Sequence, residues 1–182
     1  ESVSIVFMHS YKYPQHERQC AAIAKELGFK NVTTSSEINP LIKFISRGDT
    51  TLVDGYLTPA LHRYIDKLEN EIQSLDKSRR HVSANSNTLV NDKNRANDLE
   101  IRFMKSDGGL TTKDFFRGRD ALISGPAGGV VGATKSAAVH GLRNIVGFDM
   151  GGTSTDVCYF QGEFERVFET TIDGIRVRAP ML

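Results

Sequence analysis

The sequence predicts an α/β fold with a parallel or mixed sheet, on three observations. Short runs rich in β-branched residues alternate with an amphipathic helix in the N-terminal part, which is the order of a βαβ unit. In the C-terminal part, two apolar runs flank a glycine-rich turn, as in a β-hairpin. The 182 residues are 39% hydrophobic and 25% charged, which is typical of a globular chain and not of a fibre or a disordered protein.

The first element is a strand over residues 3–8, followed by a helix over residues 14–29. Pro14 suits the first turn of that helix and Gly28 suits its end, so the start and stop signals agree with the apolar period. A short strand over residues 32–35 then completes the βαβ unit.

A second helix is predicted over residues 58–75, with Thr58 as its cap and Pro59 as its opening residue. Its apolar stripe indicates that it covers a core: Leu61, Ile65, Leu68, Ile72 and Leu75. Residues 76–98 have no apolar period and are rich in Ser and Asn, which predicts a polar loop or a disordered insertion. The chain thus divides into an α/β segment (1–75), the insertion (76–98) and a second lobe (99–182).

The second lobe begins with a strand that ends in an Asp107-Gly108-Gly109 turn, followed by a short helix near residues 112–116. A brief strand then leads into a helix that ends at Gly141 and carries a surface of small residues, including Gly128 and Gly129. Two interpretations of those glycines stay open. They allow close packing on a sheet, or they lie near a helix N-terminus that binds phosphate.

The segment "NIVGFDMGGTSTDVCYF" at residues 144–160 combines two strands with a turn that has an aspartate at each end. Gly151 and Gly152 would let backbone N–H groups approach phosphate oxygens, and three hydroxyls could donate to the same oxygens: Thr153, Ser154 and Thr155. Asp149 and Asp156 would repel phosphate unless a cation intervenes. The pattern therefore predicts a phosphate site in which Asp149 holds Mg²⁺, directly or through water, and both aspartates take part in catalysis.

Each of these residues could also have a purely structural role. The turn could be an ordinary glycine hairpin, and Asp107 could face a ligand or simply reverse the chain. Cys20 and Cys158 are expected to be packed thiols. His16, four residues before Cys20, lacks the third ligand that a zinc site needs.

Charge and composition exclude several partners. The net charge is +1 with scattered Lys and Arg, so we expect neither nucleic acid nor a membrane as a partner. Two isolated cysteines favour a reducing cytoplasmic setting. The chain has no apolar run of membrane-spanning length, and its abrupt ends lead us to expect a piece of a longer protein.

Two motifs carry a family resemblance. "SGPAGGVVGA" and "GFDMGGTSTDV" resemble the hydantoinase A and oxoprolinase family of ATP-dependent amide-ring hydrolases, and three further segments resemble its 5-oxoprolinase branch: "YLTPALHRYI", "FMKSDGGL" and "GEFERVFETTIDGIRVRAPML". The resemblance implies an actin, hexokinase and chaperone-ATPase-like (ribonuclease H-like) lobe in which residues 149–156 form the second phosphate loop. The first loop of that superfamily, D-x-G-G-T-F-T-D, has no counterpart in residues 1–148, so we expect an incomplete lobe.

The resemblance further implies hydrolysis of 5-oxo-L-proline to L-glutamate coupled to hydrolysis of ATP with Mg²⁺, and no side-chain nucleophile. The expected partners are a small-molecule substrate and either the remainder of the enzyme or a partner hydrolase subunit, and we expect the full-length protein to be a homo-oligomer. Three alternatives stay open: a hydantoinase, a ketone carboxylase subunit, and a non-catalytic actin-like nucleotide-binding module.

Overall fold

The computed structural model of the chain describes residues 1–85 and 100–182, with side chains for residues 1–75 and 100–182. Its architecture is mixed α/β, as predicted. The helices are α1 (Gln15–Glu26), α2 (Ser35–Ile38), α3 (Phe44–Asn85), the 3₁₀ turn η1 (Lys113–Phe115), α4 (Gly118–Ala121) and α5 (Ser124–Val139). The strands are β1 (Ser2–Ile5), β2 (Asn31–Thr34), β3 (Phe103–Met104), β4 (Leu110–Thr111), β5 (Asn144–Met150), β6 (Thr155–Gln161), β7 (Thr170–Ile172) and β8 (Ile175–Val177).

The strands pair two by two. β1 and β2 are parallel and are joined through α1, which confirms the predicted βαβ unit. Each of the other pairs is antiparallel: β3 with β4, β5 with β6, and β7 with β8. The described part of the chain contains no sheet wider than two strands.

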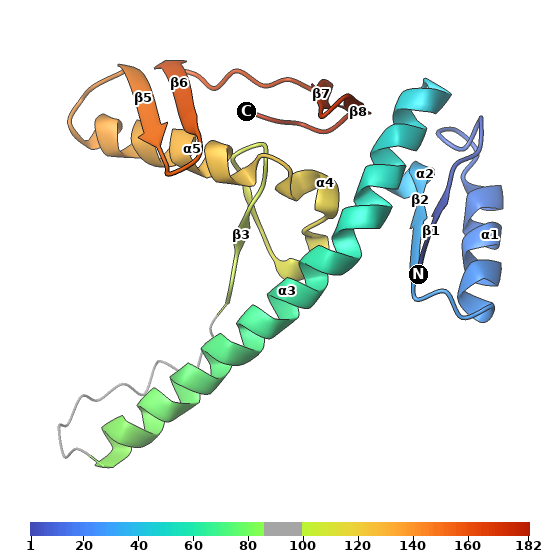
Figure 1. Cartoon of the computed structure of the whole chain (residues 1–182), viewed down its shortest axis with the longest axis horizontal. Coiled ribbons are helices and arrows are strands. Elements are labelled where there is room, and N and C mark those ends of the chain that lie inside the picture. Colours follow the sequence, from blue (N-terminus) through green and yellow to red (C-terminus); the bar gives the residue numbers. More distant parts are fainter. Residues whose placement is uncertain (86–99) are drawn as a thin grey trace.

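The long helix α3 connects the N-terminal βαβ unit with the C-terminal half of the chain (Figure 1). Its N-terminal half contacts β1 and β2, and it also contacts α4 and β8, while its last turns project away from the other elements (Figure 1). A glycine makes the approach of the βαβ unit possible, because a Cβ on Gly55 would lie 2.5 Å from Ser4 Oγ and 3.3 Å from Thr33 Oγ1.

The predicted start of this helix is wrong. α3 begins at Phe44 and Pro59 lies inside it, where a proline removes one backbone hydrogen bond and crowds the preceding turn. Thr58 does not cap the helix. Its Oγ1 instead accepts a hydrogen bond from Gly118 N at 2.8 Å, so tertiary contact overrides the local start signal.

The helix also runs to Asn85, into the segment 76–98 that the sequence predicts to be a polar loop or disordered insertion. Residues 86–99 lie outside the described residues. Another local difference concerns the brief strand predicted before α5, since that stretch contains the end of helix α4 and a turn.

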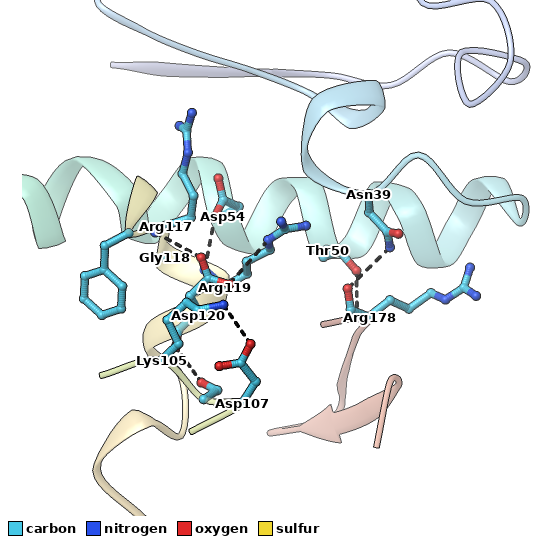
Figure 2. A network of polar contacts seen from close by, with 12 residues as sticks. Asn39, Thr50, Asp54, Lys105, Asp107, Arg117, Gly118, Arg119, Asp120 and Arg178 are labelled. Carbon is cyan, nitrogen blue, oxygen red and sulfur yellow. Dashed lines mark hydrogen bonds and ion pairs between the residues drawn. The ribbon is translucent and has the colours of Figure 1, made fainter. Parts of the chain in front are cut away.

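Three polar side chains spaced four residues apart on α3 attach the C-terminal half of the chain, and Figure 2 shows two of them, Thr50 and Asp54. Thr50 Oγ1 accepts a hydrogen bond from Arg178 N at 3.0 Å, and Asp54 Oδ1 accepts one from Arg119 N at 3.1 Å. Together with Thr58 they form a buried polar ridge, because residues four apart share one face of a helix. Each pairing satisfies a backbone donor that would otherwise be buried without a partner.

Nearer its N-terminus, α3 buries the charged side chain of Arg47, which is 0% exposed. The guanidinium donates to three backbone carbonyls: Nη1 to Leu41 at 2.8 Å, and Nη2 to Phe7 at 2.6 Å and to Met8 at 3.0 Å. Nε donates to Ser35 Oγ at 3.0 Å. The hydrogen bonds fix the loops that follow β1 and α2 against α3.

Glu17 completes this network without touching the arginine. Ser35 Oγ donates to Glu17 Oε1 at 2.6 Å, so this hydroxyl links the two charged groups. Burial would raise the pKa of Glu17, but hydrogen bonds from Ser35, Ser36 and Phe7 N outweigh it, so the pKa of the carboxyl is lowered.

We predict that Arg47→Lys loosens the loops around Phe7 and Leu41 in the full-length protein. A lysine cannot reproduce the planar fork of donors, so buried carbonyls lose their partners at a cost of about 3 kcal/mol. Hydrogen–deuterium exchange of peptides covering these loops should accelerate. Arg63→Lys, on an exposed position of the same helix, is the control and should leave exchange unchanged. Unchanged protection in Arg47→Lys would contradict the role given to the guanidinium.

Candidate phosphate-binding site

The hairpin of β5 and β6 places Asp149 directly opposite Asp156 in its register. Opposite residues of an antiparallel pair project from the same face of the sheet, a few ångströms apart. Both side chains are exposed, and neither forms an ion pair or a side-chain hydrogen bond with the described residues. Like charges in this arrangement repel each other, and a bound cation would relieve the repulsion.

The helix α5 covers the face of the hairpin that carries these carboxylates. A Cβ on Gly147 of β5 would lie 3.7 Å from Ala133 Cβ, and one on Gly129 would lie 3.8 Å from Asp149 Oδ2. The structure therefore places Gly129 next to the carboxylate of Asp149. Gly128 instead faces β3, with Met104 Cγ 3.6 Å from the position of an added Cβ, which favours the packing interpretation for that residue.

The tip of the hairpin, residues 151–154, is closed by one backbone hydrogen bond, from Gly151 N to Ser154 O at 2.9 Å. Neither Gly151 nor Gly152 has a positive φ angle. A Cβ on Gly152 would meet nothing within 4 Å, and one on Gly151 would make only an ordinary contact of 3.7 Å with Ser154 O. The fold of the described chain does not require glycine at either position, and the absence of side chains leaves the tip open to an approaching group.

The hydroxyls of this tip are available to bind a ligand. Thr153, Ser154 and Thr155 are exposed, and their side chains form no hydrogen bond with any residue that the structure describes. Three donors of this kind, next to small residues, can surround an anion from one side.

A cleft of about 500 Å³ opens between α5 and the hairpin. Asp149, Asp156 and Gly129 line it, together with Glu163 and Glu165, whereas no lysine or arginine of the described chain does. The sequence analysis missed the two glutamates; the signal was their position directly after β6, beyond the Gly162 turn. Because the carboxylates are not offset by cations here, this cleft can accept a phosphate group only together with a metal ion.

The donor set fits magnesium better than a metal held wholly by the protein. No group of three His, Cys, Asp or Glu side chains in the described ranges is arranged to hold a metal ion. Mg²⁺ commonly keeps several waters and binds through one or two carboxylates plus substrate phosphates. Asp149 and Asp156 could supply those carboxylates, and the nucleotide and water would supply the other ligands.

The open question about Asp107 is answered by its contacts. Lys105 Nζ lies 2.7 Å from Asp107 Oδ2, and Gly109 N donates to Asp107 Oδ1 at 2.8 Å (Figure 2). Burial would raise the pKa of Asp107, but the Lys105 and Gly109 interactions outweigh it and lower that pKa. The side chain is occupied in closing its own turn.

The neighbouring residues of this turn are also structural. Gly108 has φ +79°, and a Cβ there would lie 2.6 Å from Leu182 Cδ1. Ser106 is 0% exposed; its Oγ donates to Asp120 O at 2.7 Å and its carbonyl accepts from Leu182 N at 2.9 Å. The turn therefore anchors the last residues of the chain to α4.

The two cysteines and His16 do not form a further site. Cys158 lines the cleft, but its Sγ packs so closely over Gly147 that a side chain at that glycine would collide with it. Cys20 is half-buried on α1, and His16 is exposed on the same helix.

Comparison with known proteins places these features in a family. The family model "Hydantoinase/oxoprolinase" matches residues 47–182. The 5-oxoprolinase of Dictyostelium discoideum is 40% identical over 195 residues, an alignment that covers all of this chain and 14% of the relative. The chain thus spans about a seventh of the length of that relative.

Solved structures agree with this relationship. Nucleotide-free acetone carboxylase, from a study of ATP-dependent acetone carboxylation, matches with a TM-score of 0.76 and 27% identity over 98% of this chain and 23% of its own. The ATP-dependent caprolactamase of Pseudomonas jessenii matches with a TM-score of 0.74 and 26% identity over 100% of this chain and 24% of its own.

Among the residues that the structure describes, no helix combines the length and the apolar character that crossing a bilayer requires.

The match of the family model over residues 47–182, together with 40% identity to a 5-oxoprolinase along the entire chain, shows that this chain belongs to the hydantoinase/oxoprolinase family.

Proposed function

We propose that the full-length protein is an ATP-dependent 5-oxoprolinase that hydrolyses 5-oxo-L-proline to L-glutamate, and that the β5–β6 hairpin is part of its nucleotide site. The observation that carries the proposal is the tip of the hairpin. It has two glycines that the described fold does not require, three hydroxyls without partners, and a pair of opposed carboxylates. The 40% identity to a 5-oxoprolinase supports the choice of substrate.

The proposed lobe is actin-like, with residues 149–156 as its second phosphate loop. The structural similarity to acetone carboxylase and to caprolactamase, both described as ATP-dependent, supports this assignment. The opposing first loop and the rest of the nucleotide pocket would come from other parts of the full-length protein. Gly151 and Gly152 would admit the phosphates, and the hydroxyls at 153–155 would donate to their oxygens.

The internal amide of 5-oxoproline explains why ATP is needed. Amide resonance makes the carbonyl carbon a poor electrophile, and ATP supplies a phosphoryl group whose transfer to the amide oxygen would create a better leaving group. In this reaction the chain's own residues would position the phosphates and hold the metal ion that offsets their negative charge. Asp149 and Asp156 would hold Mg²⁺ or its waters beside the phosphates, and no side-chain nucleophile is needed.

A related activity on another substrate is the second candidate. Acetone carboxylase and caprolactamase share this fold at 27% and 26% identity, so the same fold occurs in enzymes whose names specify different substrates. Cytoplasmic location, self-association and the non-catalytic actin-like alternative stay predictions from the sequence.

The test of the activity uses the purified full-length protein with Mg-ATP and three substrates in parallel. We expect ADP and L-glutamate to appear in equal amounts with 5-oxo-L-proline, because ring opening and ATP hydrolysis are coupled. Hydantoin and acetone should produce little ADP above the background without substrate. A larger ADP release with hydantoin or acetone would assign the protein to the related activity instead.

The Asp149→Asn variant tests the carboxylate pair. The substitution preserves side-chain size but removes the charge that would hold Mg²⁺, so we expect 5-oxoproline-dependent ADP release to fall at least about a hundredfold, a loss of some 2.7 kcal/mol of barrier reduction. The melting temperature without nucleotide should be unchanged or higher, because the repulsion with Asp156 is removed. Asp173→Asn, an exposed turn residue between β7 and β8, is the matched control. Normal coupled turnover by Asp149→Asn would show that this carboxylate is not part of the site.

The Gly152→Val variant tests the tip. Because nothing lies within 4 Å of an added Cβ and φ is not positive, we expect the variant to fold normally while its side chain blocks the approach of phosphate. Wild type should gain about 2.7 kcal/mol of stability at a hundredfold excess of Mg-ATP over Kd, and the variant should gain almost none.

The control for this variant is Gly132→Val, which also enters open space but on α5. It should keep the full stabilisation by Mg-ATP. An equal response of Gly152→Val and wild type would mean that the turn is only structural.

A further inference from the structure

The structure has a second polar cleft, of about 290 Å³, remote in sequence from the hairpin. It lies where α1, β2 and α2 meet the middle of α3 and the start of α4. Its charged residues are Lys25, Lys30 and Arg117 against a single carboxylate, Glu37. Three cations against one carboxylate leave an excess of two positive charges, with His62 counted as neutral.

These cations are not neutralised within the described residues. Lys25, Lys30 and Arg117 form no ion pair there, whereas Lys113 on the neighbouring 3₁₀ turn contacts both Asp66 and Glu69. Unpaired cations that converge on one cleft attract an anion more strongly than scattered surface charges do.

The position of Arg117 depends on a close contact between α4 and α3. Gly118 N donates to Thr58 Oγ1 at 2.8 Å, and a Cβ on Gly118 would lie 2.6 Å from Leu57 Cβ. Only glycine permits this approach, and Arg117 N is also held by Asp120 Oδ2 at 3.2 Å. Figure 2 shows the Arg117 side chain extending away from Asp120 and past α3, and Arg117 is one of the residues that line the cleft.

Two polar groups in the wall have unused hydrogen-bonding capacity. His62 Nε2 lies 2.9 Å from Phe116 O; a carbonyl only accepts, so the ring proton is on Nε2 and Nδ1 has no partner within the described chain. Thr34 is 2% exposed, and its Oγ1 is buried without a partner among the residues described. A buried hydroxyl in this state is unfavourable unless a ligand or water completes it.

We propose that this cleft binds a small oxyanion, a phosphate or carboxylate group, at a site separate from the nucleotide site. The planar fork of Arg117 suits two oxygens of such a group, and Lys25 and Lys30 would complete its coordination. The volume is at the lower limit for small-molecule pockets, which suits a small anion and excludes a whole nucleotide.

The test measures binding of inorganic phosphate, and separately of succinate, to the full-length protein by calorimetry at constant ionic strength. Preference for one of the two identifies the oxyanion class. We expect Arg117→Met to weaken binding of the preferred anion at least about tenfold, because a charge-assisted bidentate contact is lost. Arg63→Met, on an exposed position of α3, should bind as wild type does.

Asp149→Asn separates this site from the nucleotide site. If the cleft is the oxyanion site, Asp149→Asn should bind the anion as wild type does even if its ATP hydrolysis is lost. Anion binding that is lost in Asp149→Asn and kept in Arg117→Met would place the ion at the hairpin and overturn the proposal. Absence of phosphate and succinate binding to wild type would also overturn it.

Discussion

The arrangement of the molecule depends on polar side chains that are buried along α3 and hydrogen-bonded to the backbone of other segments. Arg47 is fully buried on one side of the helix, and removing such a charge from water is costly unless hydrogen bonds replace those to water. Its contacts with the backbone of Phe7, Met8 and Leu41 hold the N-terminal unit. Further along the helix, the Thr50, Asp54 and Thr58 ridge accepts backbone donors of the C-terminal half. One helix thereby fixes two units that share few other contacts.

The candidate phosphate site differs from α3, because its polar side chains have no hydrogen-bond or ion-pair partner among the described residues. Asp149 and Asp156 face each other in a cleft that also contains Glu163 and Glu165. Four carboxylates at one cleft, without a cation among the residues that line it, repel one another and add no stability to the fold. The arrangement is consistent with a cationic ligand, and a metal-bound nucleotide provides such a ligand together with acceptors for the tip hydroxyls.

Sequence patterns predicted the elements whose signals are local. Pro14 and Gly28 mark the ends of α1, since Pro14 is its N-cap residue and Gly28 follows its C-cap with φ +94°. The hairpin around Gly151 and Gly152 was predicted because glycine and the two apolar runs are adjacent in the chain. The family that these motifs resemble was confirmed by the comparisons.

Features that depend on distant contacts were not predictable in this way. Pro59 suggested a helix start, but the helix continues through it while the preceding Thr58 accepts from Gly118, sixty residues later in the chain. The different roles of Gly128 and Gly129 also depend on which strand faces each residue, Met104 of β3 or Asp149 of β5. A helical period gives the face of a residue but not the identity of the element that covers it.

The most direct measurement of the central claim is a structure of the full-length protein with Mg-ADP bound. The account predicts density for a phosphate group within hydrogen-bonding distance of the backbone at Gly151 and Gly152. It also predicts a metal ion whose ligands or bound waters contact the Asp149 carboxylate. Nucleotide bound elsewhere, with the tip of the β5–β6 hairpin in contact only with protein or solvent, would contradict it.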